Sequence, residues 1–170
     1  EIASCLVGSE MCIRDSKGEQ RIMKIAIGSD HGGFALKEAV KKHLEAKGAE
    51  VEDFGCYSAD SVDYAVFGAK VAHCVADGKA QYGVLVCSTG IGISIAANKV
   101  KGIRAALCCD AHAAEMTRRH NNANILCMGG LAVSEETGLE IVDAFLHFEF
   151  EGGRHQRRID QITAIEDGAL

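Results

Sequence analysis

The chain has 170 residues, which suits one domain with a hydrophobic core of its own. Hydrophobic residues make up 48% of it, but no apolar run is long enough to cross a bilayer, so we expect a soluble globular protein without a membrane partner. With 18 Lys and Arg residues against 24 Asp and Glu residues, the formal net charge is −6, which argues against broad binding to nucleic acid or anionic lipid.

The chain contains eight cysteines, but a domain of this size does not need disulfides to fold. We see neither a secretory signal nor a Cys-x-x-Cys pair, so we expect reduced thiols and a cytoplasmic location. Cys108, Cys109 and His112 could be imagined as metal ligands. Neighbouring residues on a strand point to opposite faces, however, so we expect the two thiols to diverge and predict neither a metal nor a cofactor.

Residues 1–22 differ from the rest of the sequence because they have no sustained helix or strand period. Met23 directly precedes a clear strand pattern. We interpret residues 1–22 as an expression-derived or upstream extension that packs poorly on the domain, with a genuine N-terminal arm as the alternative. The folded domain is then residues 23–170.

From Met23 onward, strand and helix patterns alternate. In chain order we predict strand Lys24–Ser29, helix Phe34–Lys47, strand Glu50–Phe54, helix Asp63–Ala76, strand Tyr82–Cys87, helix Ile91–Lys99, strand Ile103–Cys108, helix Ala111–His120, strand Asn124–Met128, helix Ser134–His147 and helix Gln156–Ile165. This alternation predicts an α/β fold: a three-layer, Rossmann-like domain in which helices cover both faces of a five-stranded parallel sheet.

Ligands of such sheets bind beyond the carboxyl ends of the strands. Asp30 and His31 follow the first strand and precede two glycines. The pair could transfer protons and contact a ligand, whereas the alternative is that Asp30 only caps the next helix. The turn lacks the G-x-G-x-x-G pattern and carries an acid where a pyrophosphate would lie, so we do not expect a dinucleotide site.

The third strand ends at Cys87 and continues into a glycine-rich turn that opens a helix. The backbone N–H groups of such a turn have no partner within the helix and bind negative charge. Gly90 and Gly92 allow the backbone to approach a ligand closely, and Thr89 adds a hydroxyl. We therefore interpret Cys87 as a nucleophile or general base, with a structural thiol as the alternative.

Two segments near the C-terminus carry clustered basic residues. His120 and Asn121 follow two arginines at a predicted helix end, where cations also stabilise the helix simply through its dipole. Arg154 and Arg158 are four residues apart and thus share a helix face, which suits a phosphate dianion or, alternatively, a solvated surface. Together these groups suit proton transfer next to a carbonyl on a small phosphorylated substrate.

The sequence also resembles the sugar-phosphate isomerase family that contains the type B ribose-5-phosphate isomerases and the galactose-6-phosphate isomerase subunits, and it is most similar to the type B ribose enzymes. The resemblance extends from Met23 to about Glu166. It rests on the motifs Gly28-Ser29-Asp30-His31-Gly32-Gly33, Val62-Asp63-Tyr64, Cys87-Ser88-Thr89-Gly90-Ile91-Gly92-Ile93-Ser94-Ile95-Ala96-Ala97-Asn98-Lys99, Arg119-His120-Asn121-Asn122-Ala123-Asn124 and Glu151-Gly152-Gly153-Arg154-His155.

This resemblance implies interconversion of D-ribose 5-phosphate and D-ribulose 5-phosphate through an enediolate, without metal or cofactor, in the non-oxidative pentose phosphate pathway. Cys87 matches the family's proton-transferring base, because Ile93 stands where some members have a glutamate. Thr89 matches a residue that assists at the hydroxyls, and Asp30 and His120 match residues implicated in opening the furanose ring.

The resemblance also implies which residues hold the sugar phosphate. Tyr64 and Asn121 match sugar-contacting residues, and His31, Arg154 and Arg158 match the phosphate site. The backbone amides from Thr89 to Gly92, which include Gly90 and Ile91, would hold the enediolate oxygen, and Ser88 beside them counts among the substrate-binding residues. Family members share each site between two subunits, so a homodimer or a dimer of dimers is implied.

Two departures from the family pattern leave alternatives open. Leu131 stands where many relatives have a phosphate-linked arginine, and Ala65 replaces the usual proline after Tyr64. Because of Leu131, an isomerase of a six-carbon sugar phosphate, such as allose 6-phosphate or galactose 6-phosphate, is the second hypothesis. The third is a non-catalytic sugar-phosphate binder or a subunit that needs a partner.

Overall fold

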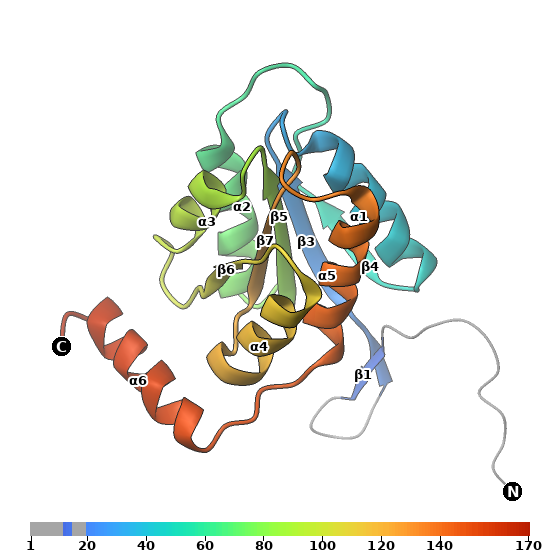
Figure 1. Ribbon diagram of the computed structural model, residues 1–170. Coiled ribbons are helices and arrows are strands. Elements are labelled where there is room, and N and C mark those ends of the chain that lie inside the picture. Colours follow the sequence, from blue (N-terminus) through green and yellow to red (C-terminus); the bar gives the residue numbers. More distant parts are fainter. Residues whose placement is uncertain (1–11, 15–19) are drawn as a thin grey trace, which may run out of the picture.

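The computed structural model describes residues 12–14 and 20–170 (Figure 1). Its main sheet has five parallel strands in the order β4-β3-β5-β7-β6. Their bounds are β3 Lys24–Ser29, β4 Glu50–Asp53, β5 Tyr82–Cys87, β6 Ala105–Leu107 and β7 Ile125–Gly129. Ser29 pairs with Val86 and Cys87 with Gly129, so the carboxyl ends of β3, β5 and β7 lie side by side.

Helices cover both faces of this sheet (Figure 1). On one face lie α2 Tyr64–Ala76 and α3 Ile91–Ala97, and on the other lie α1 Phe34–Ala46, α4 Ala111–Asn121 and α5 Glu135–His147. The predicted fold class, a Rossmann-like α/β domain with a five-stranded parallel sheet, is therefore confirmed. None of the described helices is long and apolar enough to span a membrane.

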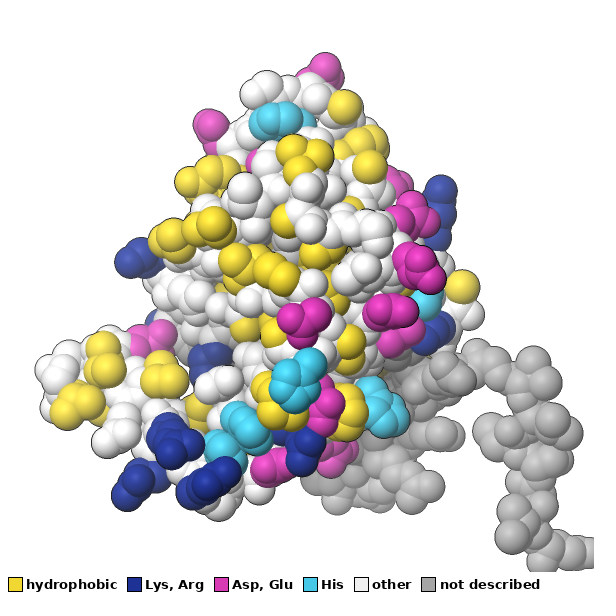
Figure 2. All heavy atoms as spheres, viewed as in Figure 1, with side chains coloured by type: hydrophobic (Ala, Val, Ile, Leu, Met, Phe, Trp, Pro, Cys, Tyr) yellow, Lys and Arg dark blue, Asp and Glu magenta, His cyan; other side chains and the backbone are white. Residues whose placement is uncertain are grey.

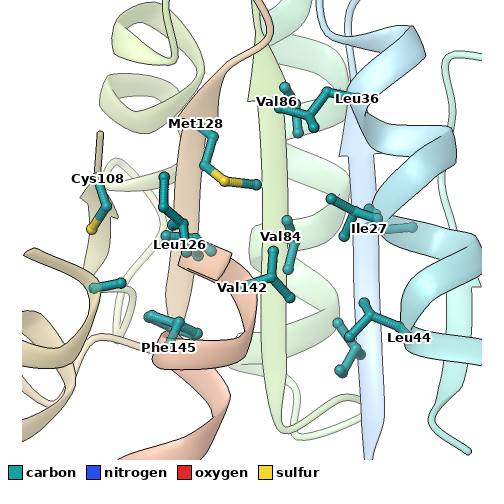
Figure 3. Packing of buried hydrophobic residues seen from close by; sticks show 14 of the residues in the cluster. Ile27, Leu36, Leu44, Val84, Val86, Cys108, Leu126, Met128, Val142 and Phe145 are labelled. Carbon is teal, nitrogen blue, oxygen red and sulfur yellow. The ribbon is translucent and has the colours of Figure 1, made fainter. Parts of the chain in front are cut away.

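Alternation along the strands produces two hydrophobic clusters, one on each face of the sheet. Val84, Val86 and Met128 point toward α1 and α5, where they meet Leu36 and Val142 (Figure 3). The intervening residues Leu85, Cys87 and Cys127 point toward α2 and α3. Because side chains on a strand alternate in direction, these buried strands are apolar on both faces and need a helical layer on each.

The last helix, α6 Arg154–Glu166, extends away from the sheet instead of packing on either face of it (Figure 1). Its side chains Ile162 and Ile165 are 46% and 61% exposed. A pocket of about 260 Å³ lies where α6 approaches the rest of the domain. The residues that line it are Asn98, Ile103, Arg104, Ala105, Ala106, Thr117, Asn121, Ala123 and Ile162.

Strand β6 is shorter than the predicted strand Ile103–Cys108. The Asn98 side chain donates to the Ala105 carbonyl and accepts from its N–H, at 2.8 Å in each case. Arg104 N–H donates to the Asn124 side-chain oxygen, also at 2.8 Å. Asn98 thus satisfies backbone groups of Ala105, the first residue of β6, and Asn124 binds the N–H of Arg104, which directly precedes the strand.

Part of the N-terminal segment pairs as a short hairpin that the sequence pattern did not predict. Strand β1 Cys12–Arg14 runs antiparallel to β2 Gln20–Ile22. Residues 1–11 and 15–19, which belong to the same predicted extension, lie outside the described residues. The division of the chain into residues 1–22 and a domain of residues 23–170 stays a prediction.

Candidate active site

The loops after β3, β5 and β7 pack on one another at the carboxyl edge of the sheet. Gly33 lies so close to β5 that an added Cβ would be 2.3 Å from the Val86 carbonyl oxygen. Gly130 lies equally close to Gly32, because an added Cβ would be 2.6 Å from the Gly32 carbonyl oxygen. The Gly130 N–H also donates to the Cys87 carbonyl at 2.8 Å. The three loops thus form one continuous surface, and any larger residue at these contacts would separate them.

Asp30 and His31 lie on the loop after β3. Asp30 is buried, and its Oδ1 accepts the Gly33 N–H at 3.0 Å. This bond closes the turn before α1, so the interpretation of Asp30 as a cap describes part of its role. His31 is exposed, and its Nδ1 accepts the Val62 N–H at 3.2 Å. In a neutral imidazole the ring proton then lies on Nε2, which is the nitrogen left to donate to a ligand.

Cys87 ends β5 with its side chain 4% exposed. Its Sγ accepts the Gly90 N–H at 3.1 Å. Gly90 has a φ of 77°, and an added Cβ would be 2.4 Å from Leu107 Cδ1, so this turn requires glycine. Thr89 is exposed, and its Oγ1 accepts the Ile91 N–H at 3.4 Å. One short turn therefore presents a thiol, a hydroxyl and the first backbone amides of α3.

Tyr64 begins α2 and lies against the first turn of α3. An added Cβ on Gly92 would be 2.6 Å from Tyr64 Cζ, so the ring packs directly on that glycine. Tyr64 remains 42% exposed. Ile93, the residue after Gly92, is fully buried in the core. Ser88 completes the turn, and its carbonyl accepts the Leu131 N–H at 3.0 Å. The structure thus brings one group of predicted site residues to this edge: Asp30, His31, Tyr64, Cys87, Ser88, Thr89, Gly90, Ile91 and Gly92.

The remaining predicted residues form a second group around the end of α4. The rings of His120 and His155 stack with centroids 4.2 Å apart. Glu151 faces both rings, with its Oε2 3.7 Å from Nε2 of His120 and 3.9 Å from Nε2 of His155. Arg119 anchors this carboxylate through an Nε donor 2.6 Å from Glu151 Oε1. Asn121 is the last residue of α4, and Arg154 is the first residue of α6.

The charges in this second group favour an anion. Burial, followed by the positive charges of His120, Arg154 and Arg158, lowers the pKa of His155. In the described part of the chain, the ligand atoms of His120, Glu151 and His155 lie within 4.8 Å of one another, as in a site for a metal ion. The guanidinium of Arg119 already pairs with Glu151, however, and Arg154 Nε lies 3.4 Å from His155 Nε2. These positive groups oppose the binding of a cation.

The two groups lie at opposite ends of the sheet. Arg118 of α4 donates to the hydroxyl of Tyr82 at 2.8 Å, and Tyr82 is the first residue of β5. Cys87 is the last residue of that strand, so the two ends of β5 are about 16 Å apart at 3.3 Å per residue. Histidine side chains are accordingly visible at both ends of the molecule (Figure 2). Within one chain, therefore, His120 does not reach Cys87.

Some features of the site were not assigned from the sequence. Glu151 and His155 belong to the motif Glu151-Gly152-Gly153-Arg154-His155, but the sequence predicts no role for either residue. Val62 likewise gave no sign that its N–H would meet His31. Arg118, interpreted only as a cation near a helix end, is buried and lies with its guanidinium carbon 4.6 Å from the centre of the Tyr82 ring. A buried arginine on an otherwise polar helix leaves no periodic signal.

The cysteines follow the expected pattern. Cys108 is buried and Cys109 is exposed, so the two thiols diverge, although both follow the end of β6 and do not lie on the strand as predicted. Burial, together with Cys109 and Asp110, raises the pKa of Cys108 to about 12. This thiol therefore stays protonated at neutral pH and is a poor metal ligand.

The family model of the ribose/galactose isomerases matches residues 25–162. The chain belongs to this family. It is 48% identical over 143 residues to ribose-5-phosphate isomerase B of Escherichia coli K12, an alignment that covers 84% of this chain and 96% of that protein. The expected enzyme class, an aldose–ketose isomerase, is confirmed at this level.

Solved structures of the family agree in fold. The ribose-5-phosphate isomerase B of Clostridium thermocellum is 51% identical with a TM-score of 0.85, covering 87% of this chain and all of that one. The Mycoplasma genitalium enzyme, solved with bound ribulose-5-phosphate, is 43% identical with a TM-score of 0.83. That comparison covers 86% of this chain and 99% of the other.

Proposed function

We propose that this chain interconverts D-ribose 5-phosphate and D-ribulose 5-phosphate, with Cys87 as the base. The observation that carries this proposal is the turn at the end of β5, where the Gly90 N–H holds the Cys87 sulfur beside Thr89 and the first amides of α3. Ile93, at the position where some relatives have a glutamate, is an apolar residue of the core. The Mycoplasma genitalium relative, described with bound ribulose-5-phosphate, supports the choice of substrate.

The proposed step moves one proton between two carbons. The Cys87 thiolate removes the proton from C2 of the open-chain aldose, the C–H electrons form the C1–C2 double bond, and the carbonyl electrons move onto O1. The backbone amides after Thr89 stabilise this enediolate oxygen. Thr89 assists transfer of the hydroxyl proton from O2 to O1. As the C2 carbonyl forms, C1 takes the proton back from the Cys87 thiol, which completes the ketose and regenerates the thiolate.

The other residues bind the substrate and open the ring. Asp30 and His120 act on the furanose oxygens, and Tyr64, Ser88 and Asn121 contact the sugar. His31, Arg154 and Arg158 bind the phosphate, since imidazole and guanidinium groups donate hydrogen bonds to phosphate oxygens. The positive charges of His120, Arg154 and Arg158 around His155 support binding of the phosphate at this second group of residues.

We further propose that each site is shared between two copies of the chain, in a homodimer or a dimer of dimers. The separation of Cys87 and His120 along the length of β5 supports this, since one chain does not bring its two groups together. The extended α6, with Ile162 and Ile165 exposed, supplies apolar area for contact with a second copy. A cytoplasmic enzyme of the non-oxidative pentose phosphate pathway agrees with the six described cysteines, which are all free thiols.

A six-carbon sugar phosphate is the second candidate substrate, and Leu131 favours it. This residue is 79% exposed on the loop after β7, and its N–H donates to the Ser88 carbonyl. An apolar side chain beside the site turn offers no charge to a phosphate at that point, and this difference motivates a substrate with a longer sugar.

The deciding experiment follows chelator-treated protein with ribose 5-phosphate in heavy water by proton NMR. Formation of the ketose with deuterium in the sugar is the expected result, because a thiol base exchanges its proton with solvent. Conversion only of allose 6-phosphate or galactose 6-phosphate would select the second candidate. A folded dimer that converts none of these sugars would overturn the isomerase proposal.

A further inference from the structure

A lysine on α1 is completely enclosed although the helix faces solvent on one side. Lys37 is 0% exposed, and its Nζ donates to both carboxylate oxygens of Asp53 at 3.1 and 2.9 Å and to the Cys56 carbonyl at 2.8 Å. The same Nζ lies 2.8 Å from Oε1 of its neighbour Glu38, which is partly exposed. The rings of Phe34 and Tyr57 have their centroids 5.3 Å from the same nitrogen. Lysine is rarely buried without a partner, so these contacts make Lys37 the centre of a local structure.

The buried carboxylate partner of Lys37, Asp53, also organises the following loop. Burial by itself raises the pKa of Asp53, but hydrogen bonds from Lys37, the Gly55 N–H and Lys41 outweigh burial and hold the pKa below its ordinary value. The Gly55 N–H donates to Asp53 Oδ1 at 2.9 Å, and the Tyr57 hydroxyl donates to the Asp53 carbonyl at 2.7 Å. Asp53 thus connects Lys37 to the start of the segment 53–62.

That segment holds the loop after β3 on both sides of Asp30. The Gly55 carbonyl accepts the Ser29 N–H at 2.6 Å, and the Cys56 N–H donates to the Ser29 carbonyl at 2.8 Å. Farther along, the Val62 N–H donates to His31 Nδ1 at 3.2 Å. The residue before Asp30 and the residue after it are therefore both bonded to a segment that Lys37 ties to α1.

We propose that Lys37 is a positioning residue for Asp30 and His31, acting through the Cys56 carbonyl and the segment 53–62. The proposal rests on the proposed function, in which Asp30 and His31 touch the substrate. Lys37 itself stays enclosed and makes no contact with the sugar. Its part is to fix the segment that orients the two groups.

The chain contains a matched control one helical turn away. Lys41 also donates to Asp53 Oδ2, at 3.1 Å, but its side chain is 30% exposed. Its described hydrogen bond goes to the carboxylate and not to the loop carbonyl. Lys41→Met therefore removes a cation from the same carboxylate and leaves the Lys37–Cys56 bond in place.

The test separates positioning from stability by removing both members of the ion pair. Lys37→Met alone leaves Asp53 buried without its main partner, which destabilises the fold. Lys37→Met/Asp53→Asn removes both charges of the buried pair, leaves the partly exposed Glu38 and Lys41 to solvent, and still deprives the Cys56 carbonyl of its donor. We expect the Tm of this double variant to lie within a few degrees of the parent's Tm. Its kcat/KM for ribose 5-phosphate is nevertheless expected to fall at least tenfold. Lys41→Met is expected to match the parent.

A second readout does not depend on turnover. In protein labelled with ¹⁵N-histidine, the Nδ1 resonance of His31, assigned by its loss in His31→Asn, reports the bond from Val62. We expect it to move in the double variant and to stay in Lys41→Met. A double variant with parental kinetics and a parental His31 resonance would overturn the proposal. If the double variant does not fold, Lys37→Leu/Asp53→Leu, which replaces the buried pair by apolar residues and also removes the donor to the Cys56 carbonyl, takes its place with the same two outcomes.

The two readouts also distinguish this proposal from the proposed function. If the parent does not convert ribose 5-phosphate, the assignment of substrate fails, while the His31 resonance still decides whether Lys37 positions the loop. If the parent is active and the resonance and kinetics stay unchanged in the folded variant, only the positioning proposal fails.

Discussion

The imidazole rings of His120 and His155 lie parallel, with 4° between their planes. Both face the carboxylate of Glu151, which Arg119 holds from the other side. The stack therefore places His155 against a second imidazole, whose positive charge disfavours protonation of His155. This cluster makes stability depend on pH.

The pH dependence follows from the lowered pKa of His155, whose causes are burial and then the charges of His120, Arg154 and Arg158. In the unfolded chain His155 takes up a proton near pH 6.5, and in the folded chain it does so at lower pH. The unfolded state thus binds more protons in this window. We expect the free energy of unfolding to fall as the pH falls from about 6.5 through the folded pKa.

Urea denaturation of the parent and His155→Asn between pH 7.5 and 5 measures this effect. The variant is expected to lose part of the slope of unfolding free energy against pH. The same slope in both proteins would show that His155 does not contribute.

Replacement of Cys87 by alanine removes the proposed base. We expect the isomerisation rate to fall by about 10³-fold, in the range by which general base catalysis accelerates reactions. The fold should persist because Cys87→Ala removes a single sulfur atom from a core cluster. Turnover of ribose 5-phosphate and the near-ultraviolet circular dichroism spectrum check the two parts, and a folded variant with parental turnover would exclude Cys87.

Heterodimers of two different variants test whether each active site is shared between two copies of the chain. Cys87→Ala and His120→Asn each inactivate both sites of a homodimer. A heterodimer of the two has one site with both changes and one site with neither, so we expect about half of the parental activity per dimer. Co-expression with two different tags isolates this species. Persistent inactivity of the doubly tagged dimer would place each site within one chain.

The close contact of the loops predicts a large cost for one added methyl group. A Cβ at Gly33 would meet the Val86 carbonyl oxygen at 2.3 Å and its carbon at 2.5 Å, and neither backbone atom can move alone. We expect Gly33→Ala to lower the free energy of unfolding by about 3 kcal/mol. Gly102→Ala, where nothing lies within 4 Å but φ is +81°, is expected to cost about 1 kcal/mol. Urea denaturation compares them, and equal losses would argue against the steric explanation.

Much of the fold could be predicted from local patterns. The strands Lys24–Ser29 and Tyr82–Cys87 have the predicted bounds, because continuous apolar runs bounded by turn residues leave few alternatives. The order of the strands could not be predicted in this way, since the pairing of β5 with β7 depends on contacts between segments about forty residues apart. The bonds that join Asn98, the residue after α3, to Ala105, the first residue of β6, could not be predicted from a local pattern either.

The candidate site was predictable in chemistry but not in geometry. Cys87 and Asp30 follow strands, and that position alone brings them to one edge of a parallel sheet. His120 lies near the end of α4, on the side of the sheet where the strands begin. The sequence alone does not say which end of a second copy would face the Cys87 turn. The burial of Lys37 could not be predicted, because a lysine in an amphipathic helix normally reaches solvent. Its acceptors on Asp53 and Cys56 lie 16 and 19 residues away in the sequence.

The burial of the thiols decides what chemical labelling reports. Of the six cysteines whose side chains the structure describes, Cys109 alone is exposed, while Cys87 lies beneath the surface with its sulfur bonded to the Gly90 N–H. Among these six, an alkylating reagent in limited amount therefore modifies Cys109 first. Labelling reports on the sulfur at the end of β5 only in protein that carries Cys109→Ser together with Cys5→Ser and Cys12→Ser.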